Sequence, residues 1–198
     1  SGQFIGYFFS STMTKPTLFE NITEVSEDVR NFFISKLEEI QAEKGYKLET
    51  AGEVSKYLYY IAEGSARSFY IRENRDITVS FSLEGEFVTA MHSFITRSPS
   101  YETIETLEKS LLYRISYNDL QECFKKFPDL ERVYRMILEK YYIALEEQMI
   151  FSKFKSARER YLELMEKKPK IIQRASVGHI ASFLDMTIET LSRVRAKI

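Results

Sequence analysis

The chain has 198 residues, of which 44% are hydrophobic and 29% are charged, and its formal net charge is −1. These values are ordinary for a globular protein with one good core and a small second domain, and they exclude disordered and fibrous classes. The single cysteine, Cys123, excludes an internal disulfide and a four-thiolate zinc or iron–sulfur cluster within the chain. No apolar run approaches the roughly 20 residues that cross a bilayer, so we expect no membrane partner and a cytoplasmic location.

The chain begins at Ser1, and we expect residues 1–16 to form an N-terminal leader ahead of ordinary domain sequence. Beyond the leader, apolar residues at helical spacing predict a first helix from Glu27 to Gln41. Its apolar stripe consists of Val29, Phe32, Phe33, Leu37 and Ile40.

After this helix the pattern changes to short β-like runs that glycines separate. The aromatic-rich runs 57–62 and 66–71 are joined by a turn at Gly64, and this arrangement predicts a β-hairpin. Residues 77–83 alternate apolar and polar side chains, which indicates a strand with one buried face, and residues 111–115 repeat the pattern.

Many short strands, with turn glycines between them, predict an α+β fold class. The expected sensor domain covers residues 17–128 as an antiparallel sandwich or barrel of the jelly-roll (double-stranded β-helix) kind. The glycines that mark its turns are Gly45, Gly52, Gly64 and Gly85.

A long helix is predicted over residues 129–152, because one apolar stripe continues through a stretch without Gly or Pro. A domain of this size cannot cover every side of such a helix. We therefore expect its exposed apolar edge to pack on a copy of itself, and the alternative is simple docking against the barrel. The residues predicted for this dimer interface are Val133, Ile137, Tyr141 and Leu145.

Residues 153–198 predict a helix-turn-helix. The first short helix has an inward stripe and a cap at Ser176, and the second is capped by Thr187. The first stripe consists of Val177, Ile180, Ala181 and Leu184, and the second of Ile188, Leu191, Val194 and Ile198. The outer face of the second helix carries Glu189, Ser192, Arg193 and Ala196 at helical spacing.

Charge supports an interaction of this segment with nucleic acid. Residues 153–198 hold eleven Lys and Arg against five Asp and Glu, whereas residues 1–152 hold seventeen against twenty-four. A basic end on an acidic body lets only one surface approach phosphates, with Lys168, Lys170 and Arg174 among the expected positioning contacts. The alternative is a small helical hairpin whose charges are merely solvated.

The order of these parts resembles the Crp/Fnr family of bacterial transcription regulators over residues 17–198. The similar stretches are Lys47–Glu53, Tyr57–Gly64, Glu84-Gly85-Glu86-Phe87, Ala157–Tyr161, Ile180–Leu184 and Thr190-Leu191-Ser192-Arg193. The resemblance implies a homodimer that reads a palindromic double-stranded DNA site, RNA polymerase as a further partner, and an unknown small-molecule effector.

On the recognition helix, the resemblance assigns base-edge contacts to Glu189 and Arg193, in agreement with the exposed helical face. The complete set of expected DNA contacts is Thr187, Glu189, Thr190, Ser192, Arg193 and Lys197. The turn carries Asp185 where the family usually has Gly, which a positive φ tolerates, and Ile188 stands where some members have a basic residue. The chain stops at Ile198, so the wing of many members is expected to be short or absent.

For the effector, the resemblance places Gly85 and Glu86 at the start of the phosphate-binding cassette. The most natural alignment puts Pro99 at the family's arginine position and Ser100 at its hydroxyl, and proline donates no hydrogen bond. Arg97 and Ser98 are the alternative anion contacts if the loop is longer. A cyclic nucleotide is therefore doubtful as the ligand, and no cofactor is assigned.

No spacing of the two histidines, His92 and His179, predicts a metal site or an activated nucleophile, so neither a metal nor an enzyme is expected. Glu102, Glu105 and Glu108 are evenly spaced and are interpreted as a solvated face. The alternative function is a ligand-sensing or protein-interaction module whose helical tail docks on a partner protein instead of DNA.

Overall fold

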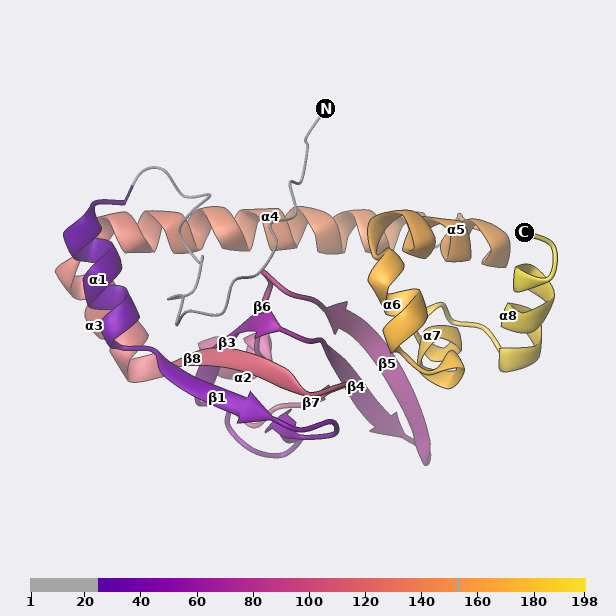
Figure 1. Cartoon of the computed structure of the whole chain (residues 1–198), viewed down its shortest axis with the longest axis horizontal. Helices are drawn as coiled ribbons and strands as arrows, with labels where there is room; N and C mark the ends of the chain where they lie inside the picture. The colour runs from indigo at the N-terminus through magenta and orange to yellow at the C-terminus, as the bar shows by residue number, and fades with distance from the viewer. Residues whose placement is uncertain (1–24, 153) are drawn as a thin grey trace.

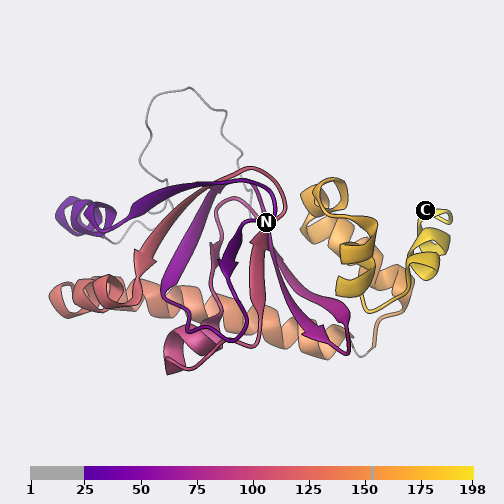
Figure 2. The same cartoon turned by 90° about the horizontal axis from the view of Figure 1, so that it is seen from below.

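The computed structural model describes residues 25–152 and 154–198, so the predicted leader lies outside the described residues. A β-roll of two sheets lies against the long helix α4 (Pro128–Ser152), which leads to the C-terminal helices (Figure 1, Figure 2). Among residues 25–152 and 154–198, none of the helices has the length and apolarity that a membrane span requires.

The β-roll consists of two four-stranded antiparallel sheets, which confirms the predicted antiparallel arrangement of the strands. The first sheet has the order β1 (Glu38–Ala42), β8 (Ser110–Ser116), β3 (Tyr57–Glu63), β6 (Phe87–Val88). The second has the order β2 (Lys47–Glu49), β7 (Thr103–Thr106), β4 (Ala66–Arg72), β5 (Arg75–Ser82). Fully buried side chains, among them Ile61, Ile104 and Leu112, form a core in the roll.

The predicted hairpin of residues 57–71 is wrong, because β3 and β4 belong to different sheets. The chain crosses between the sheets at Gly64, whose φ is +98°. A Cβ at this position would lie 2.2 Å from the Ser110 hydroxyl oxygen, so the crossing needs glycine for space as well as for conformation. A sequence pattern of two strands around a glycine cannot distinguish this corner from a hairpin.

The predicted helix of residues 27–41 is too long. The helix α1 (Glu27–Ser35) is capped by Ser26, whose hydroxyl accepts from the Val29 amide, and it ends at Lys36. The following residues form β1, which pairs with β8 and buries Ala42. Leu37 and Ile40 fit the helical period only by coincidence, and the hydrogen bonds of the sheet prevail over that period.

The strand predicted at residues 77–83 exists as β5, but its alternation is interrupted. Ser68 pairs with Ser80 and Phe69 with Thr78, so Val79 is an extra residue in the ladder. As a result Thr78 is buried and Ile77 is 37% exposed, the reverse of the prediction. In β8, Leu112 is buried, whereas its neighbours Leu111 and Tyr113 are only partly buried.

Three helices share a second hydrophobic core with the roll: α1, α2 (Met91–Thr96) and α3 (Tyr117–Lys126). The first turns of α4 share their core, because Leu130 and Val133 are 3% and 7% exposed and pack with Phe33 and Leu120. The helix α4 therefore does dock on its own protomer at this end.

The C-terminal helices are α5 (Ala157–Lys167), α6 (Pro169–Arg174), α7 (Val177–Phe183) and α8 (Ile188–Arg195). Ile180, Leu191 and Val194 are buried together, as the inward stripes predict. Val177 is 40% exposed, and Ile188 and Ile198 are 50% and 54% exposed, so the predicted inward orientation of these three residues is wrong. Val177 and Ile188 are the first residues of α7 and α8, and Ile198 lies beyond the end of α8.

Candidate nucleic-acid interface and ligand cavity

The turn between α7 and α8 has the predicted chemistry. The Ser176 hydroxyl accepts from the His179 amide at 3.1 Å, and the Thr187 hydroxyl accepts from the Thr190 amide at 3.2 Å. Asp185 has a φ of +50°, so this residue adopts the left-handed conformation that the turn requires. Arg160 donates to the Asp185 carbonyl at 3.3 Å and joins the turn to α5.

The outer face of α8 is open to solvent. Glu189, Ser192, Arg193 and Ala196 are all exposed, and Lys197 follows them. Hydrogen bonds from its own backbone N–H and from Thr187, together with Arg193, hold the pKa of Glu189 below its ordinary value. Glu189 is therefore an ionised acceptor beside a cationic donor on one surface.

Of the six residues predicted to contact DNA, Thr187 and Thr190 also have local partners. Thr187 caps the helix, and Arg193 donates to the Thr190 hydroxyl at 3.2 Å. The remaining residues, Glu189, Ser192, Arg193 and Lys197, have exposed side chains. A surface that combines a carboxylate, a guanidinium and hydroxyls at helical spacing has the groups that read base edges in a major groove.

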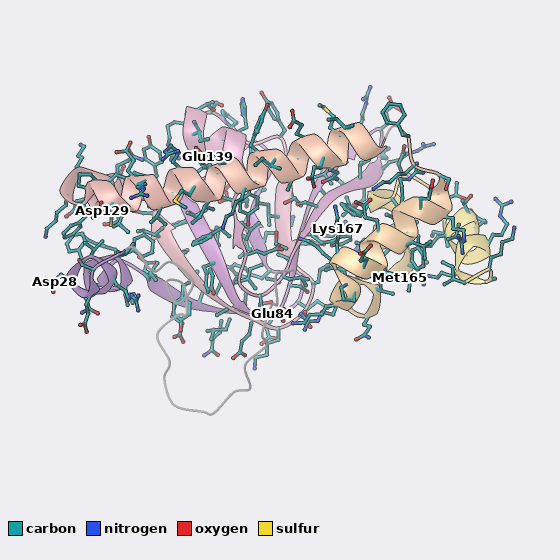
Figure 3. All side chains as sticks on the ribbon, turned by 90° about the horizontal axis from the view of Figure 1, so that it is seen from above. Asp28, Glu84, Asp129, Glu139, Met165 and Lys167 are labelled. Atoms are coloured by element: carbon teal, nitrogen blue, oxygen red, sulfur yellow. The ribbon has the colours of Figure 1, made fainter. Side chains whose placement is uncertain are left out.

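The C-terminal helices are docked on the β-roll through ion pairs. Lys168 lies 3.0 Å from Glu86 and donates to the Phe81 carbonyl at 2.6 Å. Glu84 accepts from Arg174 and lies 3.3 Å from Lys170. These three basic side chains were expected to contact phosphates, and in this arrangement they are held by the acidic roll. Figure 3 marks Glu84 on the side of the roll that faces these helices.

The helix α7 adds a polar contact to this docking surface. The Thr78 amide donates to the Ser182 hydroxyl at 2.9 Å, and that hydroxyl donates to the Asp76 carbonyl at 3.1 Å. The ring of Phe183 lies 5.1 Å from that of Phe81, which is buried against the C-terminal helices and not inside the roll. The helix-turn segment and the sensor sheet thus share one interface.

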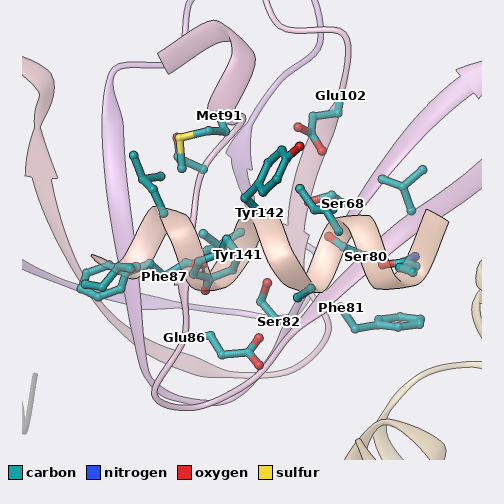
Figure 4. A pocket seen from close by; sticks show the side chains of 18 of the residues that line it. Ser68, Ser80, Phe81, Ser82, Glu86, Phe87, Met91, Glu102, Tyr141 and Tyr142 are labelled. Carbon is teal, nitrogen blue, oxygen red and sulfur yellow. Dashed lines mark hydrogen bonds between the residues drawn. The ribbon is translucent and has the colours of Figure 1, made fainter. Parts of the chain in front are cut away.

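A cavity of about 930 Å³ lies between α4 and the β-roll (Figure 4). Its apolar wall comes from β5, β6 and α4, and its polar groups come from β4, β5 and the segment before β7. The polar lining residues on the roll include Ser68, Ser80, Ser82, Thr89, His92 and Glu102. Among the described residues, the Lys and Arg side chains that line the cavity come from residues 155–168: Lys155, Arg160, Lys167 and Lys168.

Of the five residues predicted for the effector pocket, only Glu86 lines this cavity, and it is paired with Lys168. Gly85 forms a turn with a φ of +86°, and its amide donates to the Ile61 carbonyl at 2.9 Å. The turn that contains Gly85 and Glu86 thus lies at one edge of the cavity. The ion pair between Glu86 and Lys168 connects this edge to the C-terminal helices.

The other three residues predicted for the pocket point elsewhere. Arg97 donates to the carbonyls of Ser55 and Phe94 at 2.7 and 3.0 Å, so its guanidinium stabilises the loop after α2. The Ser98 carbonyl accepts from Ser93, and the Ser100 hydroxyl donates to the Glu102 carbonyl at 2.8 Å. Arg97 and Ser98 therefore do not line this cavity, and the anion contact predicted for them stays a prediction.

The sequence interpretation missed Glu102, which was assigned to a solvated face. Its carboxylate lines the cavity, and burial raises its pKa, an effect that the Ser68 hydroxyl partly opposes. Glu105 and Glu108 were assigned to the same solvated face, but both form ion pairs. Arg67 lies 2.8 Å from Glu105, and Arg174 lies 3.4 Å from Glu108. The available signal was the position of Glu102 directly before a strand that faces the interior.

The predicted dimer residues divide along α4. Val133 is buried in the protomer's own core with Ile137 against it, so both are used internally. Tyr141 donates to the Phe87 carbonyl at 2.9 Å and is 38% exposed, whereas Leu145 is 63% exposed. The far half of α4 therefore carries an exposed apolar edge, which includes Ile143, Leu145 and Ile150.

Residues 39–127 match the cyclic nucleotide-binding domain family. The chain is 27% identical over 164 residues to the fumarate and nitrate reduction regulatory protein of Vibrio cholerae and 26% identical to that of Escherichia coli K12. Both alignments cover 77% of this chain, which spans 65% of the length of these curated relatives.

Among solved structures, the chain is similar to the Thermus thermophilus catabolite activator protein, with 17% identity and a TM-score of 0.58 over 91% of this chain and 85% of that one. It is also similar to the c-di-GMP-responsive global regulator CLP of Xanthomonas campestris, with 22% identity and a TM-score of 0.69 over 87% and 91% of the two chains. These similarities show the fold. The family match places a cyclic nucleotide-binding-like domain at residues 39–127.

Proposed function

We propose that this chain is a sequence-specific DNA-binding transcription regulator of Crp/Fnr type. The observation that carries the proposal is the exposed face of α8, where Glu189, Ser192 and Arg193 lie beyond a capped turn. The relatives are named as regulatory proteins, and among the described residues no group of His, Cys, Asp and Glu forms a metal site. We do not propose an enzyme.

Each residue of the α8 face has a distinct role in the proposal. Arg193 donates two hydrogen bonds to a guanine edge, and Glu189 accepts from a cytosine amino group. Thr187, Ser192 and Lys197 contact phosphates or neighbouring bases and set the register of the helix in the groove. The apolar Ile188, half exposed at the start of α8, offers contact with a thymine methyl group.

The proposed active form is a homodimer. The exposed apolar edge of α4, with Leu145 and Ile143 at 63% and 53% exposed, pairs with the same edge of a second copy. A twofold axis between the two α4 helices brings two α8 helices to half-sites one helical turn apart, so the target is palindromic. RNA polymerase is the further partner expected of such a regulator.

Regulation follows from the docked C-terminal helices. While Glu84 and Glu86 hold Arg174 and Lys168, those cations are not available to phosphates. Glu86 and Tyr141 both line the cavity, so an occupant of the cavity contacts the docking surface and α4 at once. An effector that binds one arrangement better than the other shifts the population between them.

The test compares two arginines of the basic segment, Arg193 on α8 and the exposed Arg158 on α5. We expect Arg193→Ala to lose about 1–3 kcal/mol for a bound duplex and to relax the preference at particular bases. Arg158→Ala weakens all sequences alike, if it weakens any. Equal losses on every sequence for both variants would contradict base reading by α8.

The alternative function is a sensing module whose helical tail docks a protein. The observation in its favour is that the tail already docks on a protein surface, the β-roll. The two functions differ in salt dependence, because phosphate binding weakens steeply between about 50 and 200 mM salt whereas a docking tail has no affinity for duplex DNA to lose.

A further inference from the structure

We propose that the cavity between α4 and the β-roll binds an organic amine, a ligand with an apolar body and a protonated amino group, and that Glu102 receives this group. The inference deepens the proposed function, because it names the ligand class of the effector cavity. It also separates this cavity from one that holds an anionic cyclic phosphate.

The size and walls of the cavity suit a small organic molecule. Its volume of about 930 Å³ lies within the range of about 300–1,000 Å³ that ligand sites occupy. The lining is mainly apolar, and its contributors include Val79, Phe87, Val88, Met91, Ile137 and Leu138. An apolar body of one or two rings gains from burial here.

The polar groups of the roll converge on one side of the cavity. Ser68 pairs with Ser80 across β4 and β5, so the two hydroxyls share a face. Glu102 directly precedes β7, whose first residue, Thr103, pairs with Phe69, and this register places its carboxylate beside Ser68. Figure 4 shows Glu102 and Ser68 on the same side of the cavity, with the Tyr142 ring of α4 next to them.

The Glu102 carboxylate shares the lining of the cavity with the Ser68 hydroxyl, and no cation pairs with it among the described residues. Within residues 25–152 and 154–198, no Lys, Arg or His lies within the 4.0 Å ion-pair distance of it. A partly buried carboxylate without a counterion is unfavourable, and a ligand ammonium group supplies the counterion. Burial raises the pKa of Glu102 by more than the Ser68 hydroxyl lowers it, and no cation is among the groups that shift this pKa.

A second carboxyl group makes this side of the roll more acidic. Glu49 is 7% exposed, accepts from the Ser55 hydroxyl at 2.6 Å, and is close enough to Glu102 for the two charges to repel. Burial raises the pKa of Glu49 to about 7. Arg97 acts on Glu49 in the opposite direction and lowers its pKa, and Glu49 lies outside the cavity lining, so Glu102 is the carboxylate that a ligand contacts.

The basic residues of the cavity are already engaged at its other end. Lys168 pairs with Glu86, Lys167 pairs with Glu163 at 2.8 Å, and Arg160 donates to the carbonyls of Lys155 and Asp185. An anionic ligand would have to break these contacts. An amine at Glu102 leaves them intact.

Aromatic side chains complete the amine site. Tyr70, His92 and Tyr142 line the cavity, and His92 stacks on Tyr101 with ring centroids 4.9 Å apart. The face of a tyrosine ring attracts an ammonium group and adds to the carboxylate contact. Tyr142 belongs to α4, so a bound amine links the roll to the helix proposed for dimerisation.

The experiment is calorimetric titration of the full chain with four probes: phenethylamine, phenethyl alcohol, hydrocinnamate and cyclic AMP. The first three share one apolar body and carry a positive, neutral or negative head. We expect phenethylamine to bind at least about tenfold more tightly than the alcohol, because its head forms a charge-assisted contact with Glu102. Hydrocinnamate and cyclic AMP should bind more weakly than the alcohol or not at all.

Two variants test the assigned residue. Glu102→Gln keeps the shape and removes the charge, so it should abolish the tenfold preference for the amine while the affinity for the alcohol stays the same. Ser80→Lys places a cation beside the carboxylate, and it should transfer the preference to hydrocinnamate. Glu53→Gln, at an exposed position outside the cavity lining, is the matched control and should change nothing.

The inference is wrong if the amine fails to bind at concentrations up to about 10 mM, a limit set by the weak affinities of fragment-sized ligands. It is also wrong if hydrocinnamate or cyclic AMP binds more tightly, or if Glu102→Gln and Ser80→Lys both keep the amine preference with native circular dichroism. The titration contains no DNA. A chain that binds phenethylamine but does not bind duplex DNA would therefore refute only the proposed function. A chain that binds duplex DNA but does not bind phenethylamine would refute only this inference.

Discussion

The docking of the C-terminal helices on the β-roll leads to a sharp prediction for Glu84→Gln. Glu84 accepts from Arg174 and lies 3.3 Å from Lys170, so it holds two cations of the basic segment. The substitution keeps the shape and one acceptor oxygen but removes the charge. It leaves both cations in place for DNA, so its effect on DNA binding arises from the docking equilibrium.

The magnitude follows from the exposure of the pair. The Arg174 and Glu84 side chains are 26% and 25% exposed, whereas Lys170 is 57% exposed and contributes little. A hydrogen bond to a charged group contributes about 1.5–3 kcal/mol when shielded, and an exposed ion pair about 0.2–1 kcal/mol. We take about 1.5 kcal/mol for this partly shielded pair, which corresponds to a roughly tenfold shift toward the undocked form.

The assay is a fluorescence-anisotropy titration of a duplex selected by the wild-type chain, at one fixed salt concentration. If the docked form predominates without effector, Glu84→Gln should raise the DNA affinity by up to about tenfold. Glu53→Gln makes the same change in net charge away from the docking surface, so it measures the general electrostatic gain. Equal affinities for the two variants would refute the argument that docking withholds the basic residues from DNA.

Four further predictions concern the dimer, the C-terminal core, the sheet crossing and pH. Leu145→Glu, at a position 63% exposed, should convert the dimer to a monomer in light scattering, and a persistent dimer would exclude this edge of α4. Leu191→Ala, at a fully buried position, should cost about 2–5 kcal/mol in denaturant unfolding, and a smaller loss would mean that the C-terminal core is loosely packed. Gly64→Ala should destabilise the roll by more than about 1 kcal/mol in the same assay, because its Cβ would lie 2.2 Å from the Ser110 hydroxyl oxygen; an unchanged midpoint would mean that the crossing relaxes. Burial raises the pKa of Glu84, but hydrogen bonds from Arg174 and its own backbone outweigh that effect and hold the pKa below 4.5. The ionised Glu84 therefore stabilises the fold above pH 4.5, and this stabilisation is lost as the pH falls through the lowered pKa. Glu84→Gln should flatten this part of the pH–stability profile, measured by thermal unfolding.

Local chemistry was predictable from the sequence wherever one residue type has one main use. Ser176 and Thr187 were predicted as helix caps and Asp185 as the positive-φ residue of the turn, and all three predictions are confirmed. The period of 3.6 also predicted α4 to within one residue of its start at Pro128. These features depend on neighbours within about four residues, which the sequence displays directly.

Features that depend on distant contacts were not predictable in the same way. The sequence around Gly64 predicts a hairpin turn. In the structure Gly64 packs against Ser110, and the chain crosses there from one sheet to the other. Glu102 reads as a solvated carboxylate because the sequence does not show that α4 covers that side of the roll. Likewise, the basic residues Lys168 and Arg174 resemble free phosphate contacts until Glu84 and Glu86 are brought to them from more than 80 residues away.

The most direct test of the central claim is selection of bound duplexes from a randomised pool by the purified chain, followed by sequencing, at about 50 and 200 mM salt. The account predicts a twofold-symmetric motif whose half-sites lie one helical turn apart, with retention that falls steeply at the higher salt concentration. Arg193→Ala should lose base preferences within each half-site. Retention without a motif, or no retention at either salt concentration, would contradict sequence-specific DNA binding by α8.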